Sequence, residues 1–170
     1  MGLPDVIRRM DITSIRTALS DSDQKETSAV GRAVIAGVAG FVGTLAMSPV
    51  LLVAWVLGVL DAAAFAGLAE IVGLGSSTLL GGLIFLGGGA TTLPLLFVSL
   101  ALFFPGETLA RRGVVHASII WTGFAIAFYT GQSGVALVLY LVLTYAAHVV
   151  YGAVLGYVYG RLATIPIYEI

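Results

Sequence analysis

The chain contains no cysteine among its 170 residues. This absence excludes disulfides, thiolate metal sites, iron–sulfur clusters and cysteine nucleophiles. Charged residues are also scarce: they make up 10% of the chain, and hydrophobic residues make up 59%. A soluble domain carries about 25% charged residues. Together with a mean hydropathy of +1.05, this composition leaves too little polar surface for a soluble protein and predicts a membrane protein.

Several functional classes lack their signatures in this sequence. The net charge of −1 gives no basic face for nucleic acid. No Gly-x-Ser-x-Gly, His-Glu-x-x-His or phosphate-loop pattern is present. The Gly87–Gly89 run lies inside an apolar segment and is not a phosphate loop. We therefore expect no catalytic residue, no cofactor and no metal site, and we do not expect an enzyme.

Four apolar runs predict an all-α fold, an integral membrane bundle of four helices. The spans are expected at about 33–60, 78–104, 113–129 and 135–159. The first exceeds the roughly 20 residues that a bilayer core requires, and Pro49 is the expected bend. The second holds Gly87–Gly89 and Pro94, so it can be helical only with packed neighbours. The apolar stretch 62–72 is too short to span and predicts an interfacial or re-entrant helix on the outer side.

The basic residues fix an orientation for these spans. All eight fall in segments on one side of the predicted bundle: before the first span, between the second and third, and after the fourth. Cytoplasmic loops retain Lys and Arg. We therefore expect a multi-pass protein of the plasma membrane with both termini in the cytoplasm. The basic residues are Arg8, Arg9, Arg16, Lys25, Arg32, Arg111, Arg112 and Arg161.

The residues before the first span form a separate segment, 1–29, in front of the transmembrane domain 30–170. Residues 1–19 place apolar side chains at roughly helical spacing with arginines between them, which predicts an amphipathic helix. It either lies on the inner membrane surface or docks on a partner. Residues 20–28 are polar and predict a flexible linker.

Small residues recur every four positions in the first and fourth spans. Such spacing lets helix backbones approach closely, which drives packing in lipid. The stripes serve either packing inside the bundle or an interface with another subunit, and both interpretations remain open. They consist of Ala36, Gly40, Thr44 and Ser48 in the first span and of Gly152, Gly156 and Gly160 in the fourth.

His148 is the one ionisable side chain expected near mid-membrane, with Thr144 and Tyr151 one turn away on either side. Intramembrane ionisable groups are functional candidates. The alternative is a neutral histidine that bonds a neighbouring hydroxyl or carbonyl. A haem between His148 and His116 would fit poorly, because their depths in the two spans differ by ~10 Å at the rise of an α-helix.

Arg111, Arg112 and His116 form a predicted cationic cluster at the inner end of the third span. One interpretation is an anchor that fixes topology, with Glu107 and Arg111 as an ion pair at helical spacing. The other is contact with an anionic lipid headgroup or an acidic partner loop.

The fourth span reads His148-Val-Val-Tyr-Gly-Ala-Val-Leu-Gly-Tyr-Val-Tyr-Gly160. It resembles the closing helix of a family of small, mostly uncharacterised prokaryotic four-span proteins, whose pattern is His-x-x-Tyr-Gly-x-x-x-Gly-x-x-Tyr-Gly. The glycine-rich segment 39–47 resembles their first span, and the resemblance covers residues 31–160. It implies relatives in halophilic archaea, some of them associated with terminal oxidase genes.

Two functions are expected from these observations. The first is a non-catalytic accessory subunit of a larger membrane complex, with a respiratory terminal oxidase as the partner complex. Its partners would be membrane lipids and other integral membrane subunits. The second is a small transporter or channel that acts as a homo-oligomer, with the broken second span and His148 as elements of a pore.

Overall fold

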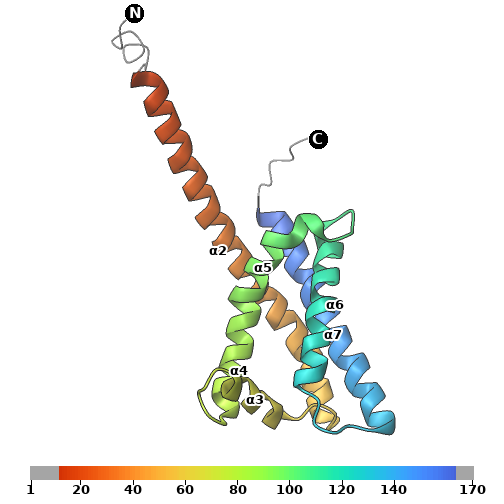
Figure 1. Cartoon of the computed structure of the whole chain (residues 1–170). Coiled ribbons are helices and arrows are strands. Elements are labelled where there is room, and N and C mark those ends of the chain that lie inside the picture. The colour runs from red at the N-terminus through yellow and green to blue at the C-terminus, as the bar shows by residue number, and fades with distance from the viewer. Residues whose placement is uncertain (1–11, 164–170) are drawn as a thin grey trace, which may run out of the picture. The chain divides into compact units, whose positions relative to one another are not determined.

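A computed structural model describes the backbone of residues 12–163 and the side chains of residues 29–163. Within this range the chain is helical, in five helical segments without a strand (Figure 1). The predicted all-α class is confirmed for the described residues. The chain divides into two compact units, residues 1–34 and 35–170. The side chains of residues 1–28, which include the predicted amphipathic helix, lie outside the described residues.

Helix α2 spans Ile12–Val56. Its backbone is helical through residues 20–28, where the sequence predicted a flexible linker. Residues 12–30 contain neither glycine nor proline, and adding residues to an existing helix costs far less than nucleating one. The helix ends at a turn in which Gly58 has φ +70° and the amides of Val59 and Leu60 bond back to the Ala54 carbonyl.

The predicted short helix at 62–72 is present as a 3₁₀ turn, Ala62–Ala64, followed by α3, Phe65–Ile71. The Asp61 carboxylate caps it by accepting a hydrogen bond of 2.8 Å from the Ala63 amide. The helix stops at Gly73, whose φ of +77° suits a residue without a side chain. Gly81 on α4 lies directly against the Phe65 carbonyl, where a Cβ would clash. This close approach holds α3 against α4.

The expected second span, 78–104, is one helical segment with an internal change of pitch. It consists of α4 (Thr78–Gly87), a π-helical turn (Gly88–Thr92), α5 (Leu93–Leu100) and a 3₁₀ turn (Ala101–Phe103). Ser77 caps its start by accepting from the Leu80 amide. The irregularity falls where the glycine run meets Pro94, as the sequence predicted.

Helices α6 (Leu109–Ala127) and α7 (Gly134–Leu162) form an antiparallel pair (Figure 1). Near the start of α6, Gly113 lies against the carbonyl of Gly152, and Gly152 lies against the carbonyl of Gly113. A Cβ at either position would clash with the opposite backbone. Near the other end, the Tyr140 hydroxyl donates to the Ala125 carbonyl at 3.0 Å. The two helices are therefore in contact over most of α6.

Three helices in the described range are long and apolar enough to cross a membrane: Ala29–Val56, Thr78–Phe103 and Gly134–Leu162. Helix α6 is not among them, although it has 19 residues. Arg111, Arg112 and His116 lower its mean hydropathy. The exposed side chains of α6 include the apolar Ile119 and Ile126.

Candidate functional site

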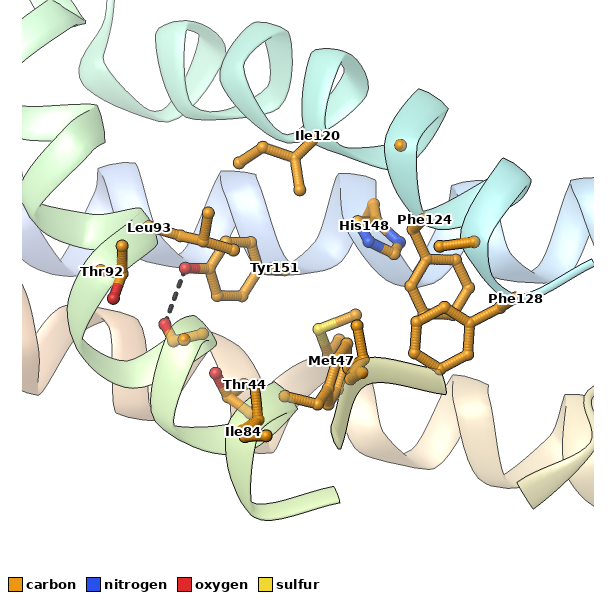
Figure 2. Close-up of a pocket in the computed structure, with 16 residues that line it drawn as sticks. Thr44, Met47, Ile84, Thr92, Leu93, Ile120, Phe124, Phe128, His148 and Tyr151 are labelled. Carbon is orange, nitrogen blue, oxygen red and sulfur yellow. Dashed lines mark hydrogen bonds between the residues drawn. The ribbon is translucent and has the colours of Figure 1, made fainter. Parts of the chain in front are cut away.

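A cavity of about 350 Å³ lies inside the second unit and is bordered by all five helical segments (Figure 2). Most of its wall is aliphatic or aromatic. The polar side chains on the wall are Thr44, Thr92, His148 and Tyr151. The remaining lining residues are Met47, Leu68, Ile84, Phe85, Gly88, Gly89, Leu93, Ile120, Gly123, Phe124, Ala127 and Phe128.

The π-helical turn Gly88–Thr92 forms one wall and has a local cause in the sequence. In this turn the Leu93 amide bonds to the Gly88 carbonyl, five residues back. The next carbonyl, that of Gly89, would pair in the same register with residue 94. That residue is proline and has no N–H. Gly89 is thus left with a carbonyl that its own helix does not satisfy, and π turns of this kind are frequent at functional sites.

Tyr151 on α7 supplies the missing donor. Its hydroxyl donates a hydrogen bond of 2.8 Å to the Gly89 carbonyl, drawn as the dashed line in Figure 2. Tyr151 is 2% exposed. A carbonyl left unpaired in apolar surroundings carries a large desolvation penalty. This bond therefore fixes α7 against the irregular part of the second helical segment.

Helix α2 closes the opposite side of the same turn. Gly40 lies against the ring of Pro94, so a Cβ at residue 40 would clash with it. A Cβ built on Gly89 would lie 2.7 Å from Thr44 Oγ1. The Thr44 hydroxyl itself donates to the Gly40 carbonyl at 2.9 Å. The small residues Gly40 and Thr44 thus let α2 pack closely against the irregular turn.

His148 lies on the cavity wall and is 3% exposed. Its Nδ1 is 2.8 Å from the Thr144 carbonyl. Because a carbonyl only accepts hydrogen bonds, Nδ1 is the protonated nitrogen and the neutral ring carries its lone pair on Nε2. No residue in the range 29–163 bonds to Nε2. In that range no enclosed side-chain nitrogen or oxygen lacks a partner, so Nε2 borders open space, and the cavity supplies it.

Aromatic rings close the cavity toward α3. Phe124 and Phe128 stack with centroids 4.1 Å apart, and Phe65 meets Phe128 edge-on at 4.8 Å. Phe85 completes this cluster at 5.3 Å from Phe65. Phe124 also lies 4.8 Å from the His148 ring, centroid to centroid.

A second group of rings lies beyond Leu93, toward the loop before α6. His116 is sandwiched between Phe97 and Phe104, with both centroid distances 5.5 Å. Phe97 also meets the Tyr159 ring at 6.4 Å. None of these four rings lines the cavity, so this group is separate from its wall.

Two glycines on different helices line the cavity without filling it. Gly88 on the π turn and Gly123 on α6 both line it, and a Cβ added to either would meet no atom within 4 Å. Gly123 is exposed. Both glycines therefore leave free space beside the cavity, one on the second helical segment and one on α6.

The two small-residue stripes of the sequence largely face other helices of the same unit. Gly152 and Gly156 lie against Gly113 and Leu109 on α6, and Gly40 lies against Pro94. Ala36 and Thr44 are buried, whereas Ser48 and Gly160 are exposed. A Cβ on Gly160 would still approach the Leu109 side chain at 3.2 Å. The positions used in packing are those closest to the irregular turn and to α6.

The predicted cationic cluster is not a single surface. Arg111 is exposed and pairs with Glu107 at 3.0 Å, which confirms the predicted ion pair. Arg112 donates from Nε to the Gly106 carbonyl at 2.9 Å. His116 is 2% exposed, and its Nε2 is 3.1 Å from the Leu93 carbonyl. Nε2 is thus the donating nitrogen of His116, in contrast to His148.

Thr144, predicted beside His148, does not reach the imidazole with its hydroxyl. That hydroxyl donates to the Tyr140 carbonyl at 2.7 Å and accepts from the Trp121 indole at 3.0 Å. Its backbone carbonyl binds His148 instead. Thr144 therefore orients the histidine through its main chain and anchors α6 through its side chain.

A comparison with protein families gives one match, to a family of unknown function, DUF6789, over residues 30–170. The chain belongs to this family. The match leaves out the N-terminal segment and covers every residue that lines the cavity. Comparisons with curated proteins and with solved structures found no match.

Sequence reasoning singled out His148 and Tyr151 but missed most of the wall around them. Pro94 and the glycine run were noted only as a break, although the missing amide of a proline predicts a free carbonyl nearby. Phe124 and Phe128 carried a usable signal, since they are spaced one helical turn apart on an apolar helix. Gly123 carried no such signal, because the sequence does not distinguish a glycine next to free space from one packed against a neighbouring helix.

Proposed function

We propose that the chain is an integral membrane protein with four spans and both termini in the cytoplasm of the plasma membrane. Three helices of sufficient length and hydropathy support this proposal. Helix α6 would be the fourth span, since its 19 residues extend about 28 Å and run antiparallel to α7. The one-sided distribution of basic residues supports the orientation.

Within the membrane, we propose the role of a non-catalytic accessory subunit of a larger complex. The observation that carries this proposal is an exposed stripe of mostly small residues on the second helical segment, hereafter the Gly87–Ser99 stripe. It consists of Gly87, Thr91, Leu95 and Ser99, all exposed within the described part of the chain.

The chemistry of the stripe suits a helix of another subunit. The hydroxyls of Thr91 and Ser99 donate to carbonyls of their own helix, at 2.7 and 2.9 Å. A Cβ added to Gly87 would meet no atom within 4 Å. Small residues at a four-residue spacing let helix backbones meet closely in lipid. The packing inside the unit leaves this stripe unused.

The partner complex we propose is a respiratory terminal oxidase, which rests on the family resemblance of the closing helix alone. The experiment is purification of the tagged protein from its native membrane in mild detergent, followed by a native gel and mass spectrometry. We expect stoichiometric subunits that carry haem or copper. A lone band at a small multiple of 17.6 kDa would contradict the proposal.

Matched variants locate the interface. Thr91→Leu and Ser99→Leu add bulk to the Gly87–Ser99 stripe, and we expect each to reduce co-purification of the partner. Thr122→Leu is the control, because Thr122 is exposed on α6 and its hydroxyl likewise bonds to its own helix, at 2.7 Å from the Ile119 carbonyl. Equal loss in all three variants would argue against an interface at the stripe.

A homo-oligomeric transporter is the second candidate, favoured by the cavity around the irregular turn. Most of that cavity's wall is aliphatic or aromatic, however, and no carboxylate, lysine or arginine lines it, so a single protomer offers no charged path there. A flux assay in vesicles with wild type and His148→Ala tests it. Flux that depends on His148 would favour the transporter over the accessory subunit.

A further inference from the structure

We propose that the cavity beside His148 binds a lipid-soluble molecule with an aromatic hydroxyl head group, a phenol or quinol, whose hydroxyl donates to His148 Nε2. The inference goes beyond the accessory role and does not depend on any partner subunit. It uses the proposed membrane location only for the route by which the molecule arrives.

The acceptor is built into the site. The Thr144 carbonyl holds the proton on Nδ1 at 2.8 Å, and this leaves Nε2 as an acceptor without a partner among residues 29–163. The His148 side chain is buried, with 3% of its surface exposed. An acceptor that faces an apolar cavity and has no donor is costly. A ligand that brings one hydroxyl removes this cost.

The residues that line the cavity favour a ligand whose head group is aromatic and uncharged. Phe85, Phe124 and Phe128 contribute rings around the histidine, and aromatic groups prefer such offset or edge-on neighbours. No carboxylate, lysine or arginine lines the cavity. A charged head group would therefore stay unpaired there, whereas a neutral aromatic alcohol would not.

Other occupants fit less well. A metal ion would lack the carboxylate or thiolate ligands that balance its charge. A plain acyl chain would fill the space but leave Nε2 unpaired. The volume of about 350 Å³ is at the lower end of the range of ligand cavities, roughly 300–1,000 Å³.

The route into the cavity is lateral. We place its opening between Gly88 and Gly123, because both line the cavity and nothing fills the space next to either glycine. Toward α3 the cavity is lined by the rings of Phe85, Phe124 and Phe128. A molecule dissolved in the hydrocarbon core can therefore enter between the π turn and α6 without crossing water.

The test uses the full-length purified protein in lipid nanodiscs with a long-chain 4-alkylphenol as the probe. The matched compounds are its methyl ether, which keeps the shape and loses the donor, and the alkylbenzene. One hydrogen bond distinguishes phenol from ether, so we expect the phenol to bind about tenfold more tightly. Equal affinity of all three compounds would overturn the proposal and leave a cavity for acyl chains.

A spectroscopic signal reports on the acceptor directly. The chain has two histidines, so ¹⁵N-histidine labelling gives two imidazoles to follow by NMR, and His116→Phe assigns them. We expect the unprotonated Nε2 resonance of His148 to shift on addition of the phenol but not of the ether. An unmoved resonance at saturating phenol would overturn the proposal.

Two substitutions separate the acceptor from the opening. His148→Phe keeps the ring and removes the lone pair, and we expect phenol and ether to bind alike. Gly123→Phe places a ring beside the cavity at a position where a Cβ meets no atom within 4 Å, and we expect slower or weaker binding of all three compounds. Thr122→Phe on the neighbouring exposed position is its control. An unchanged preference for the phenol in His148→Phe would contradict the assigned acceptor, whatever the partner experiments give.

Discussion

The Tyr151 hydroxyl donates to the Gly89 carbonyl at 2.8 Å because Pro94 cannot. In the π turn of residues 88–92 the Leu93 amide bonds to the Gly88 carbonyl, five residues back, and the same register would pair the Gly89 carbonyl with residue 94. For Gly89 that position is a proline. One tyrosine on α7 thus completes the hydrogen bonding of a helix that is far away in sequence, and it does so at the wall of the cavity.

Tyr151→Phe should destabilise the protein by about 1–3 kcal/mol, since it leaves a buried carbonyl unpaired. Thermal unfolding in detergent, followed by circular dichroism, measures this loss. Tyr157→Phe is the control, because Tyr157 is exposed on the same helix. A loss of the same size in both variants would contradict the assigned role of the hydroxyl.

Pro94→Ala should make the Tyr151 hydroxyl largely redundant, because an alanine amide at residue 94 can bond to the Gly89 carbonyl. The double-mutant cycle of Pro94→Ala and Tyr151→Phe isolates this effect from the loss of the proline ring against Gly40. We expect Tyr151→Phe to cost less in the alanine background. Strict additivity of the two changes would show that the proline is not the reason for the bond.

Gly113→Ala and Gly123→Ala should have effects of opposite sign on the same helix. At Gly113 a Cβ meets the Gly152 backbone, and overpacking of this kind costs about 1–3 kcal/mol. At Gly123 nothing lies within 4 Å, so alanine should stabilise α6 by up to about 1 kcal/mol through helix propensity. Unfolding of both variants under the same conditions gives the comparison. Equal shifts in one direction would argue against the close α6–α7 contact.

The sequence predicted the helices well because their ends carry local signals. Pro105-Gly106 separates α5 from α6, and the segment 130–134 turns the chain between α6 and α7. The linker at residues 20–28 was less well predicted, since polar residues without glycine or proline are compatible with either state. Which face of each helix meets which neighbour was not predictable, because small residues suit a neighbouring helix of the same chain and one of another chain equally. The exposed Gly87–Ser99 stripe and the open side at Gly123 follow only from the packing.

The absence of cysteine makes the number of spans directly measurable. Single cysteines at Pro105 and Ser133, both exposed, stand at opposite ends of α6. If α6 crosses the membrane, a membrane-impermeant maleimide should label Ser133→Cys in intact cells and Pro105→Cys only after permeabilisation. Ser76→Cys, in the exposed loop before α4, should behave like Ser133→Cys. Labelling of Pro105→Cys and Ser133→Cys from the same side would mean that α6 does not span, and it would remove the argument that places both termini in the cytoplasm.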